Sequence, residues 1–285
     1  MKLSIFLLLA MNVAFASKSV EWTPKYKKSQ TKKMDLELLT DRKVAKSTRT
    51  KSSAKKKISI IPATPLEALY LKKAKKKEHL NKLKHASLKL KQKAVPTLLK
   101  VIKSNNYPEE NRWVAIHMLG RIMGKKSAPY ISKFSKHSNW MLKLASLKVL
   151  LHLNQKQYKG IYARLLEDKS LIVRHQALQN IKEMKLTSLA PYVWKMLYNK
   201  SNYVGLKGKR KRSSIIKDAI KTVGDLGFKK ARKPMLEMFR KKKYVDVYSE
   251  LDYSLSKLEG KASPAGGMSV KKHYWNRIGI KEITI

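Results

Sequence analysis

One pattern occurs four times in this chain: NRWVAIHMLG (residues 111–120), MLKLASLKVL (141–150), VRHQALQNIK (173–182) and IIKDAIKTVG (215–224). Each stretch has an alanine at its fifth position, and successive alanines are 30, 32 and 42 residues apart. Apolar side chains recur four residues before the alanine, one after it and four after it, with few exceptions. This spacing places them on one face of an α-helix. The small alanine lets a neighbouring helix approach closely.

A second amphipathic segment precedes each of these stretches and opens with proline or a tyrosine-rich sequence. These segments are residues 95–99, 128–131, 161–166, 190–193 and 233–236. A weaker copy of the pattern follows with Leu251 in the alanine place, and Ala86 fits a degenerate first copy. Each unit is therefore predicted to be two antiparallel helices, and such units stack because none buries its own apolar face. We expect an all-α fold, a right-handed α-solenoid of about five helix pairs, over residues 61–260.

The units resemble HEAT repeats, specifically the short bacterial kind that includes the PBS-lyase-type repeats. The resemblance rests on proline near the start of the first helix and on Val-Arg-x-x-Ala and Leu-Gly in the second. Arg174 and the pair Leu119-Gly120 match best, whereas Leu142 and Ile216 occupy the arginine position in two copies. The resemblance covers residues 65–260. It implies a scaffold that binds macromolecules along a concave helix face, and it implies no particular chemistry.

The composition is strongly basic. The 285 residues include 65 Lys or Arg, 19 Asp or Glu and no Cys, which gives a formal charge of +46, while 43% of residues are hydrophobic. This apolar content permits a folded core, and a polyanionic partner would relieve the self-repulsion. The composition excludes an acidic metal-storage protein, disulfides, thiolate zinc sites and cysteine nucleophiles. Lysine outnumbers arginine 54 to 11, which favours diffuse charge attraction over sequence-specific DNA recognition.

The N-terminus has the features of a secretory signal peptide. Lys2 is followed by the apolar residues 3–13 and by Ala14-Phe15-Ala16, a small-x-small cleavage pattern. The apolar run is shorter than the roughly 20 residues that span a bilayer, and no later segment is apolar enough to do so. We therefore expect residues 1–16 to be removed, with no transmembrane span in the mature chain, and export to the periplasm or medium of a bacterium.

Two segments flank the predicted helix pairs. Residues 17–60 alternate Lys with Ser and Thr and are predicted to be disordered. Thr64-Pro65-Leu66-Glu67 has the form of a capping box, and we expect helix through residues 72–93 with a break near Asn81. Residues 261–285 form a linker and tail whose end alternates partly like a strand. The tail is expected to cap the last unit; docking on a partner's sheet edge and a loose tail are the alternatives.

A glycine-rich basic loop at residues 205–213 explains the long spacing before Ala219. It is a candidate for gripping phosphate or sulfate, and the alternative is a solvated loop that only spans a gap. Its spacing excludes a nucleotide-binding P-loop. The candidate binding residues of the loop are Lys207, Lys209, Arg210, Lys211 and Arg212.

The second helices offer another candidate surface, which we call the second-helix strip. Positions two residues before and after each alanine lie opposite the predicted buried face. The strip is predicted to lie along a polyanion, with a tryptophan stacking on a base or sugar ring; alternatively, its lysines only solvate an outward face. The candidate binding residues of the strip are Arg112, Trp113, His117, Lys143, Lys148, Arg174, His175, Lys217 and Lys221.

Catalytic patterns are scarce. The seven histidines form no His-x-x-x-His pair and none has a carboxylate at ligand spacing, so no metal and no cofactor are expected. The paired acids Glu109-Glu110 and Glu167-Asp168 are explained by helix capping. HEAT-like DNA glycosylases use aromatic residues and an Asp on the concave face, but Trp113 has no acid nearby. We therefore predict that the chain is not an enzyme.

Three functions remain as hypotheses. The first is an envelope scaffold that binds lipopolysaccharide, peptidoglycan, teichoic acid, anionic lipid or extracellular DNA through its basic face and tail. The second is a protein–protein adaptor, whose charge serves solubility and encounter steering with an envelope protein. The third, disfavoured by the missing acid, is a DNA-binding or glycosylase-like HEAT enzyme.

The signal-peptide prediction is testable on the expressed full chain. Cleavage after Ala16 yields a mature protein that begins at Ser17 and carries a formal charge of +45 because Lys2 is lost. N-terminal sequencing of the protein recovered from the periplasm or medium of a bacterial host checks this. Recovery of the chain only with an intact N-terminus would contradict it.

Overall fold

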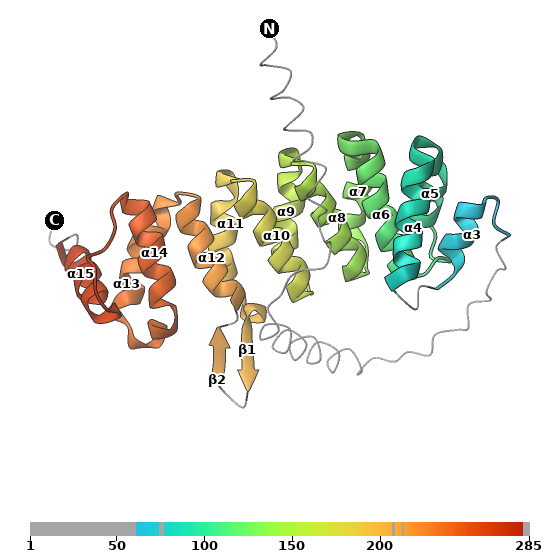
Figure 1. Ribbon diagram of the computed structural model, residues 1–285. Coiled ribbons are helices and arrows are strands. Elements are labelled where there is room, and N and C mark those ends of the chain that lie inside the picture. The colour runs from blue at the N-terminus through green and yellow to red at the C-terminus, as the bar shows by residue number, and fades with distance from the viewer. Residues whose placement is uncertain (1–60, 74–76, 207–208, 213, 282–285) are drawn as a thin grey trace, which may run out of the picture. The chain divides into compact units, whose positions relative to one another are not determined.

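The computed structural model describes residues 61–73, 77–206, 209–212 and 214–281 of the chain. The predicted signal peptide and the predicted disordered segment 17–60 lie outside these residues. The described part is helical apart from one small hairpin, which agrees with an all-α fold. Short first helices alternate with longer second helices along the chain (Figure 1).

Each first helix packs against the second helix that follows it. The first helices are α3 (Pro65–Leu71), α5 (Val95–Lys103), α7 (Ala128–Ser132), α9 (Lys159–Leu165), α11 (Ala190–Lys195) and α13 (Arg232–Arg240). The second helices are α4 (Lys77–Leu90), α6 (Glu109–Met123), α8 (Trp140–His152), α10 (Leu171–Glu183), α12 (Ser214–Asp225) and α14 (Tyr248–Glu259).

Successive second helices lie side by side and run in the same direction. Each contacts the next in chain order from α4 to α14. Two contacts come from donors three residues after the alanine place: the Asn180 amide donates to the Leu147 carbonyl at 2.8 Å, and the Ser254 hydroxyl donates to the Ile220 carbonyl at 2.8 Å. Because buried polar groups need partners, these two bonds also set the register of neighbouring helices.

The core follows the pattern that the sequence predicts. Ala115, Ala145, Ala177 and Ala219 are all fully buried, and so is Leu251 at the corresponding place in α14. The predicted buried face of the second helices is thus confirmed. In α10, for example, Val173, Leu178 and Ile181 join the alanine in the core.

The second helices also share the way in which they end. Within two residues of each helix end, one residue has a positive φ angle, which glycine and asparagine tolerate best. The residues concerned, with their φ angles, are Lys91 (48°), Gly124 (55°), Asn154 (51°), Lys185 (51°), Gly227 (66°) and Gly260 (65°). This conformation turns the chain back towards the next first helix, often through a short 3-10 turn.

The capping box before α3 is confirmed, but the predicted break in the next helix is not. The Thr64 hydroxyl accepts the Glu67 amide at 3.1 Å, and the Glu67 carboxylate accepts the Ala63 amide at 3.2 Å. The helix ends at Leu71 and restarts at Lys77, so the expected break near Asn81 was wrong. The Asn111 amide stabilises the earlier break by donating to the carbonyls of Tyr70 and Lys72 at 2.7 and 2.8 Å.

The expected basic loop is a β-hairpin. Strand β1 (Tyr203–Leu206) pairs antiparallel with β2 (Lys209–Arg212), with Tyr203 opposite Arg212 and Leu206 opposite Lys209. Two residues separate the strands, which is the commonest hairpin connection. Pairing between the strands satisfies backbone groups that a loop would leave to solvent.

The expected strand character of the C-terminal tail was also wrong. Residues Met268–Lys281 form helix α15, which packs against α13 and α14. Trp275 is fully buried there, and its indole N–H donates to the Asp252 carboxylate at 2.8 Å. The Lys271 amine donates to the same carboxylate at 2.7 Å. The tail therefore covers the last helix pair, as we expected from the sequence.

Replacing Gly224 tests the close approach of the second helices. A Cβ atom at this position would lie 2.6 Å from the Cα of Ser254, so the backbones of α12 and α14 would have to separate. We expect Gly224→Ala to lower the free energy of unfolding by about 1–3 kcal/mol, the usual cost of overpacking. Urea denaturation of the mature protein measures the change.

Gly160→Ala is the matched control. Gly160 lies in α9, and a Cβ atom there meets nothing within 4 Å. Since alanine is the better helix former, this variant is expected to gain about 0.5–1 kcal/mol. Equal stability of the two variants would show that α12 and α14 are not in close contact at Gly224.

Candidate functional site

The structure does not keep the second-helix strip together as one exposed surface. Arg112, His117 and Arg174 are buried, with 3–4% of their surface exposed, so their predicted placement on an outward face was wrong. Each second helix from α6 to α12 is covered by its first helix and by two neighbouring second helices. This leaves fewer open positions than a helix packed on one side.

The two buried arginines hold the turns between the helices. The Arg112 guanidinium donates to the Ile102 carbonyl at 3.0 Å and to the Asn105 side chain at 3.0 Å. Arg174 donates to the carbonyls of Asp168 and Ser201 at 2.8 and 3.0 Å. These bonds satisfy carbonyls near the start of the second helix, which is a structural role.

Two strip residues, on α10 and α12, contact acidic residues of the next second helix. His175 of α10 contacts Asp218 of α12 at 3.0 Å, and Lys217 of α12 lies 3.8 Å from Glu250 of α14. The hydrogen bond from His175 is the largest cause that lowers the pKa of Asp218, and the nearby charge of Lys221 lowers it further.

Lys143 of α8 is also paired: its amine contacts the Asp168 carboxylate, and its side chain is only 16% exposed. Lys143, like His175 and Lys217, is therefore engaged by an acidic residue of the neighbouring unit.

The other end of the strip is cationic. Lys148 and His152 of α8 and Lys84 of α4 lie close enough to His117 of α6 for their charges to lower its pKa. The His117 ring packs against Trp113, with 4.1 Å between ring centroids. We call the two lysines, Lys84 and Lys148, the cationic cluster.

No carboxylate compensates the lysines of the cationic cluster. Within the described residues, neither Lys84 nor Lys148 forms an ion pair, and both are half-buried. Burial lowers the pKa of Lys148, because removing water from an ammonium group penalises its charged form. An anionic group bound over the cluster would stabilise the charged ammonium groups and so offset the free-energy cost of their burial. Lys84 was not predicted, because the repeat pattern is weakest around Ala86.

Four of the five basic candidates in this segment lie in the described hairpin. Lys209, Arg210, Lys211 and Arg212 make up strand β2, whereas Lys207 lies outside the described residues. The hairpin projects from the edge at which first helices lead into second helices (Figure 1).

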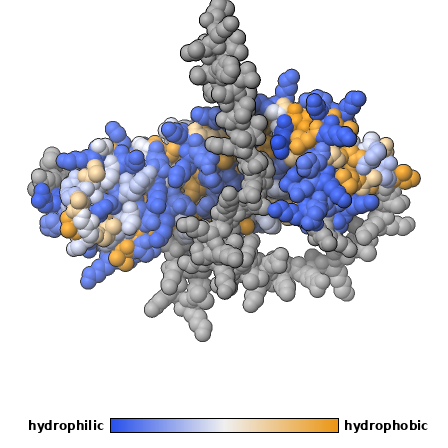
Figure 2. All heavy atoms as spheres, in the orientation of Figure 1, coloured by the Kyte–Doolittle hydropathy of each residue, from blue (hydrophilic) through white to orange (hydrophobic). Residues whose placement is uncertain are grey.

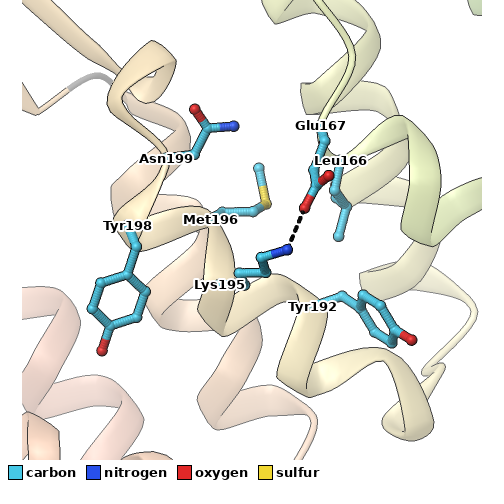
Figure 3. A pocket seen from close by; sticks show the side chains of 7 residues that line it. All are labelled: Leu166, Glu167, Tyr192, Lys195, Met196, Tyr198 and Asn199. Atoms are coloured by element: carbon cyan, nitrogen blue, oxygen red, sulfur yellow. Dashed lines mark ion pairs between the residues drawn. The ribbon is translucent and has the colours of Figure 1, made fainter.

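A small pocket lies between α9 and α11, and sequence reasoning missed it. It has a volume of about 230 Å³ and contains a salt bridge of 2.9 Å between Glu167 and Lys195. This ion pair lies between Tyr192 and Tyr198 in the view of Figure 3, and the two tyrosines are 51% and 69% exposed. The remaining lining residues are Leu166, Met196 and Asn199. The tyrosine after each Ala-Pro was a signal that could have indicated an exposed aromatic group.

Hydrophilic residues dominate the visible face of the described helices (Figure 2). Among the described residues, no group of three or more His, Asp or Glu side chains is placed to hold a metal ion. No helix within the same ranges is both long and apolar enough to cross a bilayer. No family model matches the chain, and no curated protein sequence matches it significantly.

The buried His117 predicts a pH dependence of stability. Burial, followed by the charges of Lys148, Lys84 and His152, lowers the pKa of His117 from 6.5 to about 3. Between these pH values His117 binds a proton in the unfolded chain but stays neutral in the folded chain. The stability contribution of neutral His117 is therefore complete above pH 6.5 and is lost as the pH falls towards 3.

His117→Leu removes this titration. Relative to the variant, the wild-type protein should lose about 1.4 kcal/mol of unfolding free energy per pH unit over that range. Urea midpoints at pH 7, 5.5 and 4 measure the difference, with His273→Leu in α15 as the exposed control. A difference between wild type and His117→Leu that stays constant with pH would contradict the prediction.

Proposed function

We propose that the protein is an exported, non-enzymatic HEAT-like scaffold that binds an anionic macromolecule or surface of the bacterial envelope. In this proposal the helix pairs form a right-handed α-solenoid, in the periplasm or outside the cell. The parallel register of the second helices and the positive φ angle shared by their ends support repeat units of one kind. The described part then holds six pairs, one more than the sequence pattern suggests, with α3 and α4 as the degenerate first pair.

The observation that carries the binding function is the uncompensated cationic cluster. Acidic side chains are few, and along the second helices they pair with His175, Lys182 and Lys217 instead of Lys84 and Lys148. Two half-buried ammonium groups beside two histidines are a costly arrangement in a free protein. A bound phosphate or carboxylate removes that cost, and Trp113 lies beside the cluster to contact a sugar ring.

Binding of fluorescent duplex DNA by the mature protein in a salt titration tests the proposal. Each phosphate contact adds about 0.9 to the slope of log affinity against log salt, so Lys84→Gln/Lys148→Gln should reduce the slope by about 2. Lys103→Gln/Lys136→Gln, two exposed lysines at the first-helix ends, is the control with the same charge change. Lipopolysaccharide and peptidoglycan fragments, added as competitors, identify the class of polymer.

Two results decide the outcome. A larger loss for the cluster variant than for the control supports the cationic cluster as the binding site, and a chain beginning at residue 61 shows how much the basic tail adds. Equal losses in both variants, or no binding by the wild-type protein near 150 mM salt, would overturn the proposed function.

A protein–protein adaptor is the second candidate, and the pocket between α9 and α11 favours it. Exposed tyrosines such as Tyr192 and Tyr198 are enriched in protein interfaces, where they contribute large contact areas. A salt-insensitive complex with one envelope protein, lost in Tyr192→Ser/Tyr198→Ser, would favour this function over polyanion binding.

A further inference from the structure

The turns that follow the second helices lie along one edge of the described helices. The second helices run parallel and in register, so their C-terminal ends are neighbours. Lys182 near the end of α10 lies 3.6 Å from Asp225 at the end of α12. The Gln92 amide after α4 donates to the Ile122 carbonyl near the end of α6 at 3.1 Å. These contacts bring turns that are far apart in the sequence to the same edge.

Exposed lysines occur in each of the first five of these turns. They come in pairs in three turns, Lys91 with Lys93, Lys125 with Lys126 and Lys229 with Lys230. Lys156 and Lys185 are the exposed lysines of the other two. Within the described part of the chain, none of these side chains forms an ion pair. We call this row the lysine edge.

The opposite edge has a different charge pattern. There, Glu109 and Glu110 lie in the first turn of α6, Asp168 lies just before α10, and Glu250 lies in the first turn of α14. At the lysine edge, α5, α7, α9, α11 and α13 have no acidic residue in their first turns. Carboxylates therefore support some helix N-termini at the opposite edge, although α8 and α12 have none in their first turns, and they are missing from the first turns of these five helices at the lysine edge.

Helix stability alone does not account for the lysine edge. Each lysine lies between the C-terminus of a second helix, which favours a cation, and the N-terminus of a first helix, which disfavours one. Lys91 and Lys185 adopt positive φ angles of 48° and 51°, positions that Gly124 and Gly227 fill in other turns. Lysine is the less stable choice at such a position, because its Cβ atom clashes with the backbone.

We propose that the lysine edge binds a linear phosphodiester chain laid across successive turns. Neighbouring helices pack about 8–10 Å apart, so each turn offers its cations at a regular step along the polymer. Lysine ammonium groups act as mobile point charges, which suits a repeating phosphate and requires no base recognition. This inference rests on the proposed function and assigns it a polymer class and a second surface.

The test compares two fourfold variants of the mature protein. The edge variant carries Lys125→Gln, Lys126→Gln, Lys229→Gln and Lys230→Gln. The control carries the same charge change on exposed lysines of the opposite edge, at Lys103, Lys136, Lys200 and Lys242. Circular dichroism melting confirms that both variants fold. The probes are single-stranded DNA oligonucleotides of 6 to 30 residues, poly(glycerol phosphate) and polyglutamate.

The edge variant should lose about a hundredfold in affinity for long oligonucleotides at 150 mM salt. The slope of log affinity against log salt should fall by about 3, because each phosphate contact of a single strand contributes roughly 0.7. The control should retain most of its affinity. For the wild-type protein, affinity should increase with oligonucleotide length until the probe spans the edge. Stronger binding of DNA or of poly(glycerol phosphate) then identifies the source of the phosphodiester.

Four outcomes would overturn the inference. Equal losses in the edge and control variants would mean that only net charge matters. Polyglutamate bound as tightly as the oligonucleotides would exclude phosphate as the preferred group. Full binding by the edge variant together with a loss in Lys84→Gln/Lys148→Gln would leave the proposed function intact and remove the lysine edge from it. Absence of binding by the wild-type protein would overturn both.

Discussion

The structure depends on the close approach of neighbouring second helices. Alanine occupies the contact position in four of them, and Gly120 and Gly224 face Val149 and Ser254 of the next helix without room for a Cβ atom. This approach leaves each second helix enclosed on several sides. Polar side chains that remain inside must then bond to backbone carbonyls, as Asn180 and Ser254 do. The close approach of the second helices thus determines both their packing and the register between them.

The same enclosure governs the distribution of charge. A second helix has few open positions, and where acids occur on α12 and α14 they pair with cations of the neighbouring helix. With 19 acidic residues against 65 basic ones, such pairs account for a minority of the cations. Part of the excess lies in clusters such as Lys84 with Lys148 and in the turns. Self-repulsion at those places is a standing cost of the free protein, which only an anionic partner removes.

The alternation of first and second helices, and the buried alanines, could be predicted from sequence because one helical period repeats in each unit. The positions of Arg112, His117 and Arg174 could not, because the helical pattern shows which face is apolar but not how many neighbours cover the other faces. The hairpin depends on pairing between strands, and helix α15 depends on Trp275 reaching Asp252. Such distant contacts leave no local pattern in a single sequence. Lys84 was missed for a related reason: its unit has the same fold as the others, but its sequence matches the repeat pattern only weakly.

The turns connect these observations. At the positive-φ position after each second helix, glycine, asparagine and lysine serve the same backbone purpose at different conformational cost. The fold therefore requires a turn in every unit but does not require a cation there. Because lysines recur in five such turns, the positive charges along this edge repeat once per helix pair. A compact protein partner would present charges of irregular spacing to this edge, whereas a flexible polymer adjusts its repeat to the step between helix pairs. The spacing thus favours a linear partner more than the net charge alone does.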